Sequence, residues 1–169
     1  MDKHFSTQFD AELSAVSSRV LEMGGLVESQ VARAISAMTG FDGELADQVL
    51  RDEQRVNRFE VDIDRELSGI IALRQPTARD LRLLISISRI IANLERAGDE
   101  AARTARVVKR LLDVGIAARL RLPVNDLQFE AEMAVDLLRK ALDSFARLDA
   151  LGALEVIKQD RQIDSEFEG

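Results

Sequence analysis

Apolar residues recur along the chain at alternating three- and four-residue spacing, most regularly between Arg79 and Leu112. In that segment they form one continuous apolar seam, made of Leu84, Ile87, Ile91, Leu94, Gly98, Ala101, Ala105, Val108 and Leu112. This spacing is typical of a long α-helix packed against other helices in a left-handed bundle. Leu83, Ile90 and Ala97 widen the apolar face, so we expect this helix to be buried on more than one side.

The same period predicts four further helices, and the fold class is therefore all-α. They are expected at residues 6–38, 44–73, 126–148 and from 151 onward. Gly24-Gly25 interrupts the first of them, which indicates a bend or a close crossing with a neighbouring helix. Pro76 and Pro123 separate the later helices, because proline cannot continue the hydrogen-bond ladder of a helix.

Composition narrows the classes of function. The chain has 169 residues, of which 46% are hydrophobic, and a formal net charge of −7, which argues against a nucleic-acid partner. It has no cysteine, so thiolate metal sites and disulfides are excluded. The longest uncharged run, Ala34–Phe41, is too short to span a bilayer, and the amino-terminal residues do not form a signal peptide. We expect a soluble, cytoplasmic protein with no membrane insertion.

An internal repeat organises the chain. Residues 46–57 match residues 153–164 when shifted by 107 positions, which places Asn57 on Asp164. We interpret this as a tandem repeat of a three-helix unit, with the first unit at residues 1–118. By the same offset, residues 119–169 hold only the first two helices of an incomplete second unit, so we expect a truncated form of a longer protein. The last helices would then expose an apolar face that promotes dimerisation.

Two carboxylates one turn apart, Glu95 and Asp99, lie between the apolar seam and the solvent face of the central helix. The preceding helix is predicted to run antiparallel to it, so that residues whose numbers sum to about 151 lie level. Four polar residues share one face of that helix: Glu53, Asn57, Glu60 and Asp64. This places Glu95 opposite Asn57 and Asp99 opposite Glu53. Level carboxylates repel one another unless a cation intervenes, so the pattern predicts a metal site with oxygen ligands.

The alternative is that these acids belong to a solvated face and form salt bridges with nearby arginines, such as Arg55 and Arg103. The central helix also carries an arginine stripe at seven-residue spacing, made of Arg82, Arg89, Arg96, Arg103 and Arg110. This stripe is either another solvated face or a docking surface for an acidic partner.

Six segments resemble the PhoU family of bacterial phosphate-uptake and phosphate-signalling regulators. They are QFDAEL at 8–13, MGGLVESQV at 23–31, NRFEVDID at 57–64, RQPTARDLR at 74–82, NLERAGDEA at 93–101 and QDRQIDSEFEG at 159–169. The segments follow the family's order and span nearly the whole chain. The resemblance implies two tandem three-helix bundles, of which the second is incomplete here.

The resemblance also implies metal clusters of iron, zinc, manganese or magnesium, held by E(D)-x-x-x-D motifs. In this sequence the motifs fall on Glu95/Asp99, Glu53/Asn57 and Asp160/Asp164. Asn57 departs from the motif, since a neutral amide oxygen is a weaker ligand than a carboxylate. Asp160 and Asp164 lack the partner helix of their own unit.

The function implied is not enzymatic. Members of the family are expected to connect the ATPase subunit of the phosphate ABC transporter with a sensor histidine kinase, as homodimers in the cytoplasm. They restrain uptake and the phosphate-starvation response when phosphate is plentiful. Two alternatives stay open: a metal-free helical scaffold, and a di-iron carboxylate enzyme. The enzyme normally needs Glu-x-x-His from two helices, whereas the one histidine here, His4, precedes every predicted helix.

Overall fold

Five helices make up the computed structural model, which describes residues 2–117 and 122–167, and the side chains of residues 8–117 and 122–162. The helices are α1 (Asp2–Gly40), α2 (Gly43–Arg74), α3 (Ala78–Asp113), α4 (Val124–Arg147) and α5 (Ala150–Phe167). No strand is present within these residues. Each predicted helix is therefore confirmed, with the fold class. Helix α1 begins earlier than predicted and so includes His4, whose side chain lies outside the described residues.

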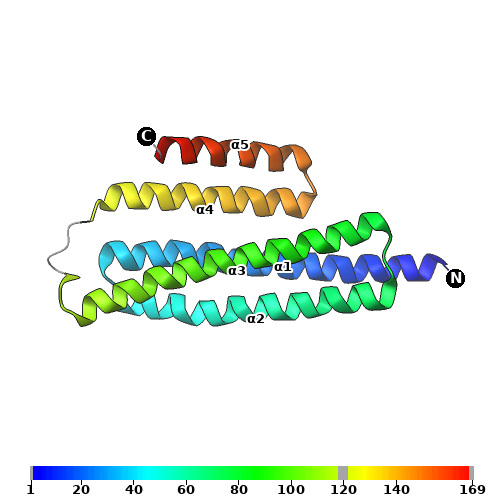
Figure 1. The fold of residues 1–169 in the computed structure, drawn as a ribbon, viewed down its shortest axis with the longest axis horizontal. Coiled ribbons are helices and arrows are strands. Elements are labelled where there is room, and N and C mark those ends of the chain that lie inside the picture. Colours follow the sequence, from blue (N-terminus) through cyan, green and yellow to red (C-terminus); the bar gives the residue numbers. More distant parts are fainter. Residues whose placement is uncertain (1, 118–121, 168–169) are drawn as a thin grey trace.

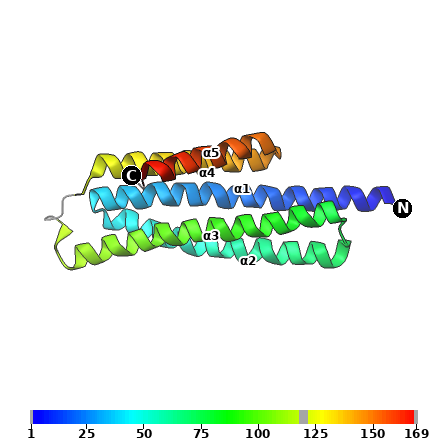
Figure 2. The same ribbon diagram turned by 45° about the horizontal axis from the view of Figure 1, so that its top comes forward.

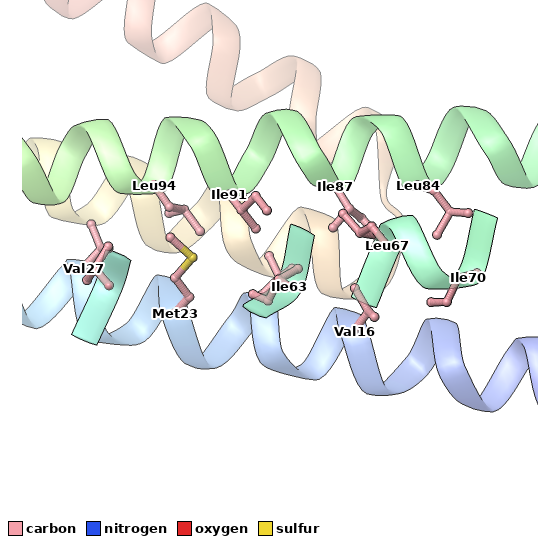
Figure 3. Close-up of a cluster of buried hydrophobic side chains, with 12 residues drawn as sticks. Val16, Met23, Val27, Ile63, Leu67, Ile70, Leu84, Ile87, Ile91 and Leu94 are labelled. Atoms are coloured by element: carbon pink, nitrogen blue, oxygen red, sulfur yellow. The ribbon is translucent and has the colours of Figure 1, made fainter. Parts of the chain in front are cut away.

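Helices α1, α2 and α3 pack side by side into a long three-helix bundle (Figure 1). Its main core is apolar and draws side chains from all three helices (Figure 3), including Val16, Met23, Val27, Ile63, Leu67, Ile70, Leu84, Ile87, Ile91 and Leu94. Beyond Leu94 the core narrows to small residues, such as Ala34, Ala101 and Ala105, so the helices can approach closely there. The predicted seam of α3 is buried except for Leu112, which lies near the end of the helix and is exposed.

The connection between α2 and α3 makes the two helices antiparallel. Gln75 ends α2 in the left-handed conformation, with φ 48° and ψ 60°, and its N–H donates to the carbonyl of Ile71. Thr77 precedes α3 in extended conformation, and its hydroxyl donates to the Asp80 carboxylate at 2.7 Å rather than accepting from the helix backbone. This short turn fixes which residues of α2 and α3 face each other.

Helix α4 packs against α1, and α5 packs against α4 (Figure 2). The α4 contact lies at Gly24, where an added Cβ would come within 2.5 Å of a methyl group of Leu142. The predicted close crossing at Gly24-Gly25 is therefore confirmed, and α1 continues through both glycines as one helix. Arg139 of α4 also pairs with Glu28 of α1.

Gln30 connects all three helices of the bundle from a fully buried position. Its side-chain amide donates to the carbonyls of Val49 in α2 and Gly98 in α3, both at 3.2 Å. A Cβ at position 98 would lie 2.9 Å from the Gln30 side-chain oxygen and 3.3 Å from Val56. Glycine at position 98 therefore allows α3 to approach α1 and α2 closely, next to the acidic residues Glu95 and Asp99.

Helix α5 leaves apolar side chains in solvent, as predicted for the last helices. Leu151 is 76% exposed, Leu154 53% and Ile157 48%. Among the described helices α5 packs chiefly against α4, so these side chains are left exposed within the described part of the chain. The predicted boundary between the two units, at residue 118, falls on residues 118–121, which lie outside the described part, so it stays a prediction.

Candidate functional site

Acidic side chains of α2 and α3 lie near one another along the line where the two helices pack, centred on Glu60 and Glu95, and we call this line the acidic groove. Glu60 is half-buried, and this burial raises the pKa of its carboxyl above the ordinary value. The negative charge of Glu95, and then that of Asp64, raise the same pKa further. One turn away, the Ser88 hydroxyl donates to the Asp64 carboxylate at 3.4 Å. The groove therefore brings acidic groups together at a cost in electrostatic free energy.

The predicted register of α2 and α3 agrees with the structure at Asp64 and Ser88, whose residue numbers add up to 152, against the predicted sum of about 151. Glu95 also interacts with Glu60, which gives a sum of 155, while Asn57 is exposed. The residue numbers of a further side-chain contact between the two helices, that of Glu53 with Arg106, add up to 159. The side chains of a helix lean toward its N-terminus. In an antiparallel pair of helices, this lean brings together side chains whose residue numbers add up to more than the position of the connecting turn alone implies.

Asp99 and Glu53, which were predicted to lie level with each other, each have an arginine neighbour. Glu53 forms an ion pair with Arg106 of α3. Asp99 lies 4.0 Å from Arg103 on its own helix, and both line a shallow surface hollow of about 370 Å³. Glu53 therefore has the arginine partner that the alternative of a salt-bridged face expected, while Asp99 stays a predicted ligand.

The predicted ligands of the second unit are not placed with the others. Asp160 is exposed on α5, and the side chain of Asp164 lies outside the described residues. Within the described part of the chain, no group of three or more acidic or histidine side chains is arranged to hold a metal ion. The residues present thus do not form a closed metal cage.

A second ionic cluster was not predicted from the sequence. Asp52 is only 7% exposed and accepts hydrogen bonds from Arg33 of α1 at 2.5 Å and from Arg55 at 2.9 Å. The sequence did hold a signal for it, since Asp52 falls between Val49 and Val56 on the inward-facing stripe of α2. An acid at such a position needs partners, and here they connect α2 to α1.

Comparison with known proteins decides the family. The sequence pattern of the PhoU domain matches residues 20–108, more than half of the chain. The chain belongs to the PhoU family. It is 45% identical, over 99% of its length, to a phosphate-specific transport system accessory protein PhoU homolog of Burkholderia, and 41% identical over its whole length to the PhoU protein of Escherichia coli K12. It spans 71% and 68% of the lengths of these two PhoU relatives.

Solved structures agree with this assignment. A crystal structure of PhoU from Pseudomonas aeruginosa matches with a TM-score of 0.85 at 41% identity, over 95% of this chain and 75% of that one. The phosphate transport system regulatory protein PhoU of Streptococcus pneumoniae matches with a TM-score of 0.81 at 28% identity, over 93% and 72%. The helical bundle described above is therefore the PhoU fold.

Membership of the PhoU family makes the chain an accessory protein of phosphate transport and not an enzyme. The alternative of a di-iron carboxylate enzyme is thereby set aside. None of the described PhoU helices is both long and apolar enough to cross a membrane.

Proposed function

We propose that this chain is a cytoplasmic adaptor of phosphate signalling. It would contact the ATPase subunit of the phosphate ABC transporter and a sensor histidine kinase, and restrain the phosphate-starvation response when phosphate is plentiful. The observation that supports this most is the 45% identity, over nearly the whole chain, to a named accessory protein of phosphate transport.

The surface of the bundle suits an adaptor, which needs separate faces for separate partners. The outer side of α3 presents exposed arginines, and α5 presents exposed leucines and isoleucine on a different part of the molecule. A charged face and an apolar face favour different partners. The long helices keep the two faces at a fixed separation.

Co-purification tests the adaptor proposal. The tagged chain would be mixed with the transporter ATPase subunit and with the cytoplasmic part of the sensor kinase, each from the same organism. We expect each to be retained, while an unrelated ABC ATPase is not. Retention of neither protein, with the chain folded by circular dichroism, would contradict the proposal.

The proposal includes a cation in the acidic groove between α2 and α3. Glu60 and Glu95 would supply carboxylate oxygens, and the raised pKa of Glu60 supports this, because a cation would relieve the repulsion that raises it. Oxygen ligands with retained water suit magnesium or manganese better than zinc, while iron also accepts carboxylates. Glu53 could join only by leaving Arg106. Asn57, Asp99, Asp160 and Asp164 remain predicted ligands.

Metal content tests this part of the proposal. Protein purified without chelator is expected to hold one of these metals, or to take it up on reconstitution, and to melt at a higher temperature when loaded. Glu60→Gln/Glu95→Gln should abolish both effects. The matched control Glu130→Gln/Glu132→Gln removes two exposed acids of α4 and should leave them unchanged. No metal in the unmodified protein would favour the metal-free scaffold.

A homodimer is the expected assembly, since the apolar face of α5 is left exposed within the described part of the chain. Light scattering on the purified chain should give the mass of two copies. Leu151→Asp/Leu154→Asp should convert it to one copy, because charges on this face oppose its burial. A monomeric unmodified chain would contradict the dimer without affecting the adaptor proposal.

A further inference from the structure

Three arginines form an exposed line on the outer side of α3, and we call them the arginine row: Arg82, Arg89 and Arg96. Within the described residues, none of the three is in an ion pair with an acid. Other basic residues of α3, such as Arg106 and Lys109, are paired with acids of α2. The guanidinium groups of the row are therefore free to bind an external anion.

Few acidic residues of α3 lie along the row, and Asp99 and Glu100 share a surface hollow with Arg96 only at its end. Between Arg82 and Arg96 the only acid is Glu95, which is half-buried and interacts with Glu60 of α2. Past Arg96 the character of the helix changes, since Asp99 and Glu100 both pair with Arg103. The arginine row therefore covers the first half of α3 and stops where these acids begin.

The spacing of the row matches a helix better than a small anion. Seven residues of α-helix rise about 10.5 Å, so the three guanidinium groups cannot converge on one phosphate. Positions seven apart drift by about 20° per repeat, so all three stay on one side of α3. Ile85, which is 42% exposed, lies between the first two arginines and adds an apolar contact.

Neither α4 nor α5 covers this face. Helix α4 packs against α1, and α5 against α4 (Figures 1 and 2), and all three arginines of the row are exposed. The whole chain carries a formal net charge of −7, which disfavours adhesion to an anionic membrane. Charge complementarity at a single helix face therefore favours a protein partner over a lipid surface.

We propose that the arginine row binds an acidic α-helix of a partner protein whose carboxylates recur every seven residues. Such a helix can follow α3 at a shallow crossing angle and place one carboxylate on each guanidinium, where two parallel hydrogen bonds can form. The proposal is independent of the metal in the acidic groove and of the dimer contact on α5.

A synthetic peptide tests the row directly. The probe is a fluorescent helical peptide with glutamate at every seventh position over three repeats. A second peptide of the same composition has its glutamates dispersed around the helix. Binding to the full chain is measured by fluorescence anisotropy at low and physiological salt. The regular peptide should bind, more weakly as salt increases, and the dispersed peptide should bind about tenfold less tightly.

Two charge-reversal variants separate the effect of the arginine row from the effect of the protein's net charge. Arg89→Glu/Arg96→Glu should weaken binding of the regular peptide by more than about tenfold. Arg51→Glu/Arg58→Glu changes the net charge equally at two exposed arginines of α2 and should keep the affinity within about twofold of the unmodified chain. Equal losses in both variants, or equal binding of both peptides, would overturn the proposal. So would binding to anionic phosphatidylglycerol vesicles through the row with no binding of the regular peptide.

Discussion

Asp52 and Glu60 are both acidic residues of α2, yet their surroundings give them opposite effects on stability. Asp52 is buried between Arg33 and Arg55, which neutralise it and connect two helices. Glu60 is half-buried beside two further acids, so its charged form is disfavoured in the folded state. Both residues are acidic, so the difference arises from the side chains that the packing of the helices places beside each of them.

Replacing Asp52 should lower stability. Asp52→Asn keeps the shape but removes the charge that two arginines share, and we expect a loss of about 1–3 kcal/mol in the free energy of unfolding. The control, Asp47→Asn, breaks the more exposed pair with Lys109 and should cost less than about 1 kcal/mol. Urea denaturation of both variants measures the difference. Equal losses would show that the Asp52 cluster adds nothing beyond a surface pair.

Glu60 should make stability depend on pH. Its pKa is raised in the folded state. Between the ordinary and the raised pKa, the folded chain therefore keeps a proton on Glu60 that the unfolded chain has released. Stability contributed by the protonated group is thus lost as pH rises from the ordinary value of 4.5 through the raised pKa. Glu60→Gln should therefore melt at a higher temperature than the unmodified protein at pH 7, in chelator, with the difference vanishing below pH about 4. A lower melting temperature at pH 7 would contradict this account of the groove.

Residue pattern alone could predict that acids gather between α2 and α3, but not which of them meet. The partners of Glu53 and Asp99 depend on long arginine side chains, which reach over several positions. Arg106 reaches Glu53 across the groove, while Arg103 turns back to Asp99. Helical period does not encode these choices, and the lean of side chains along each helix shifts the contacts further.

At the scale of elements, apolar period was sufficient to place all five helices within a few residues of their ends. The seam of α3 predicted its buried side from Leu84 to Val108. The helix against which α4 packs was harder to predict from the sequence. It depends on Gly24, which allows Leu142 to approach α1, and the sequence showed only that some helix would cross there.

Replacing each of two adjacent glycines of α1 by alanine should separate the effect of helix propensity from the effect of packing. Nothing lies within 4 Å of a Cβ at Gly25, so Gly25→Ala should raise stability by up to about 1 kcal/mol. Gly24→Ala gains the same propensity but presses on Leu142, and we expect it to be about 1–3 kcal/mol less stable than Gly25→Ala. Urea denaturation compares the two. Equal stabilities would mean that α4 does not pack on α1 in solution.

At the scale of the whole molecule, the chain is a PhoU-family bundle of three helices, with α4 packed on α1 and α5 packed on α4. Its chemistry lies on its faces: an acidic groove between α2 and α3, an arginine row on α3 and an apolar face on α5. Sequence motifs identified the family, and one of them, at residues 93–101, includes the close helix contact at Gly98 and the acids beside it. Partner contacts cannot be read in the same way, since they depend on surfaces of other proteins.

We propose above all that this chain restrains the phosphate-starvation response. The most direct test is to produce it in a bacterium that lacks its own PhoU protein but keeps the transporter and kinase, and to measure a phosphate-starvation reporter in phosphate-rich medium. We expect the reporter to fall to the level of the strain with its PhoU intact. A reporter that stays fully active, with the chain folded and abundant in the cells, would contradict the account.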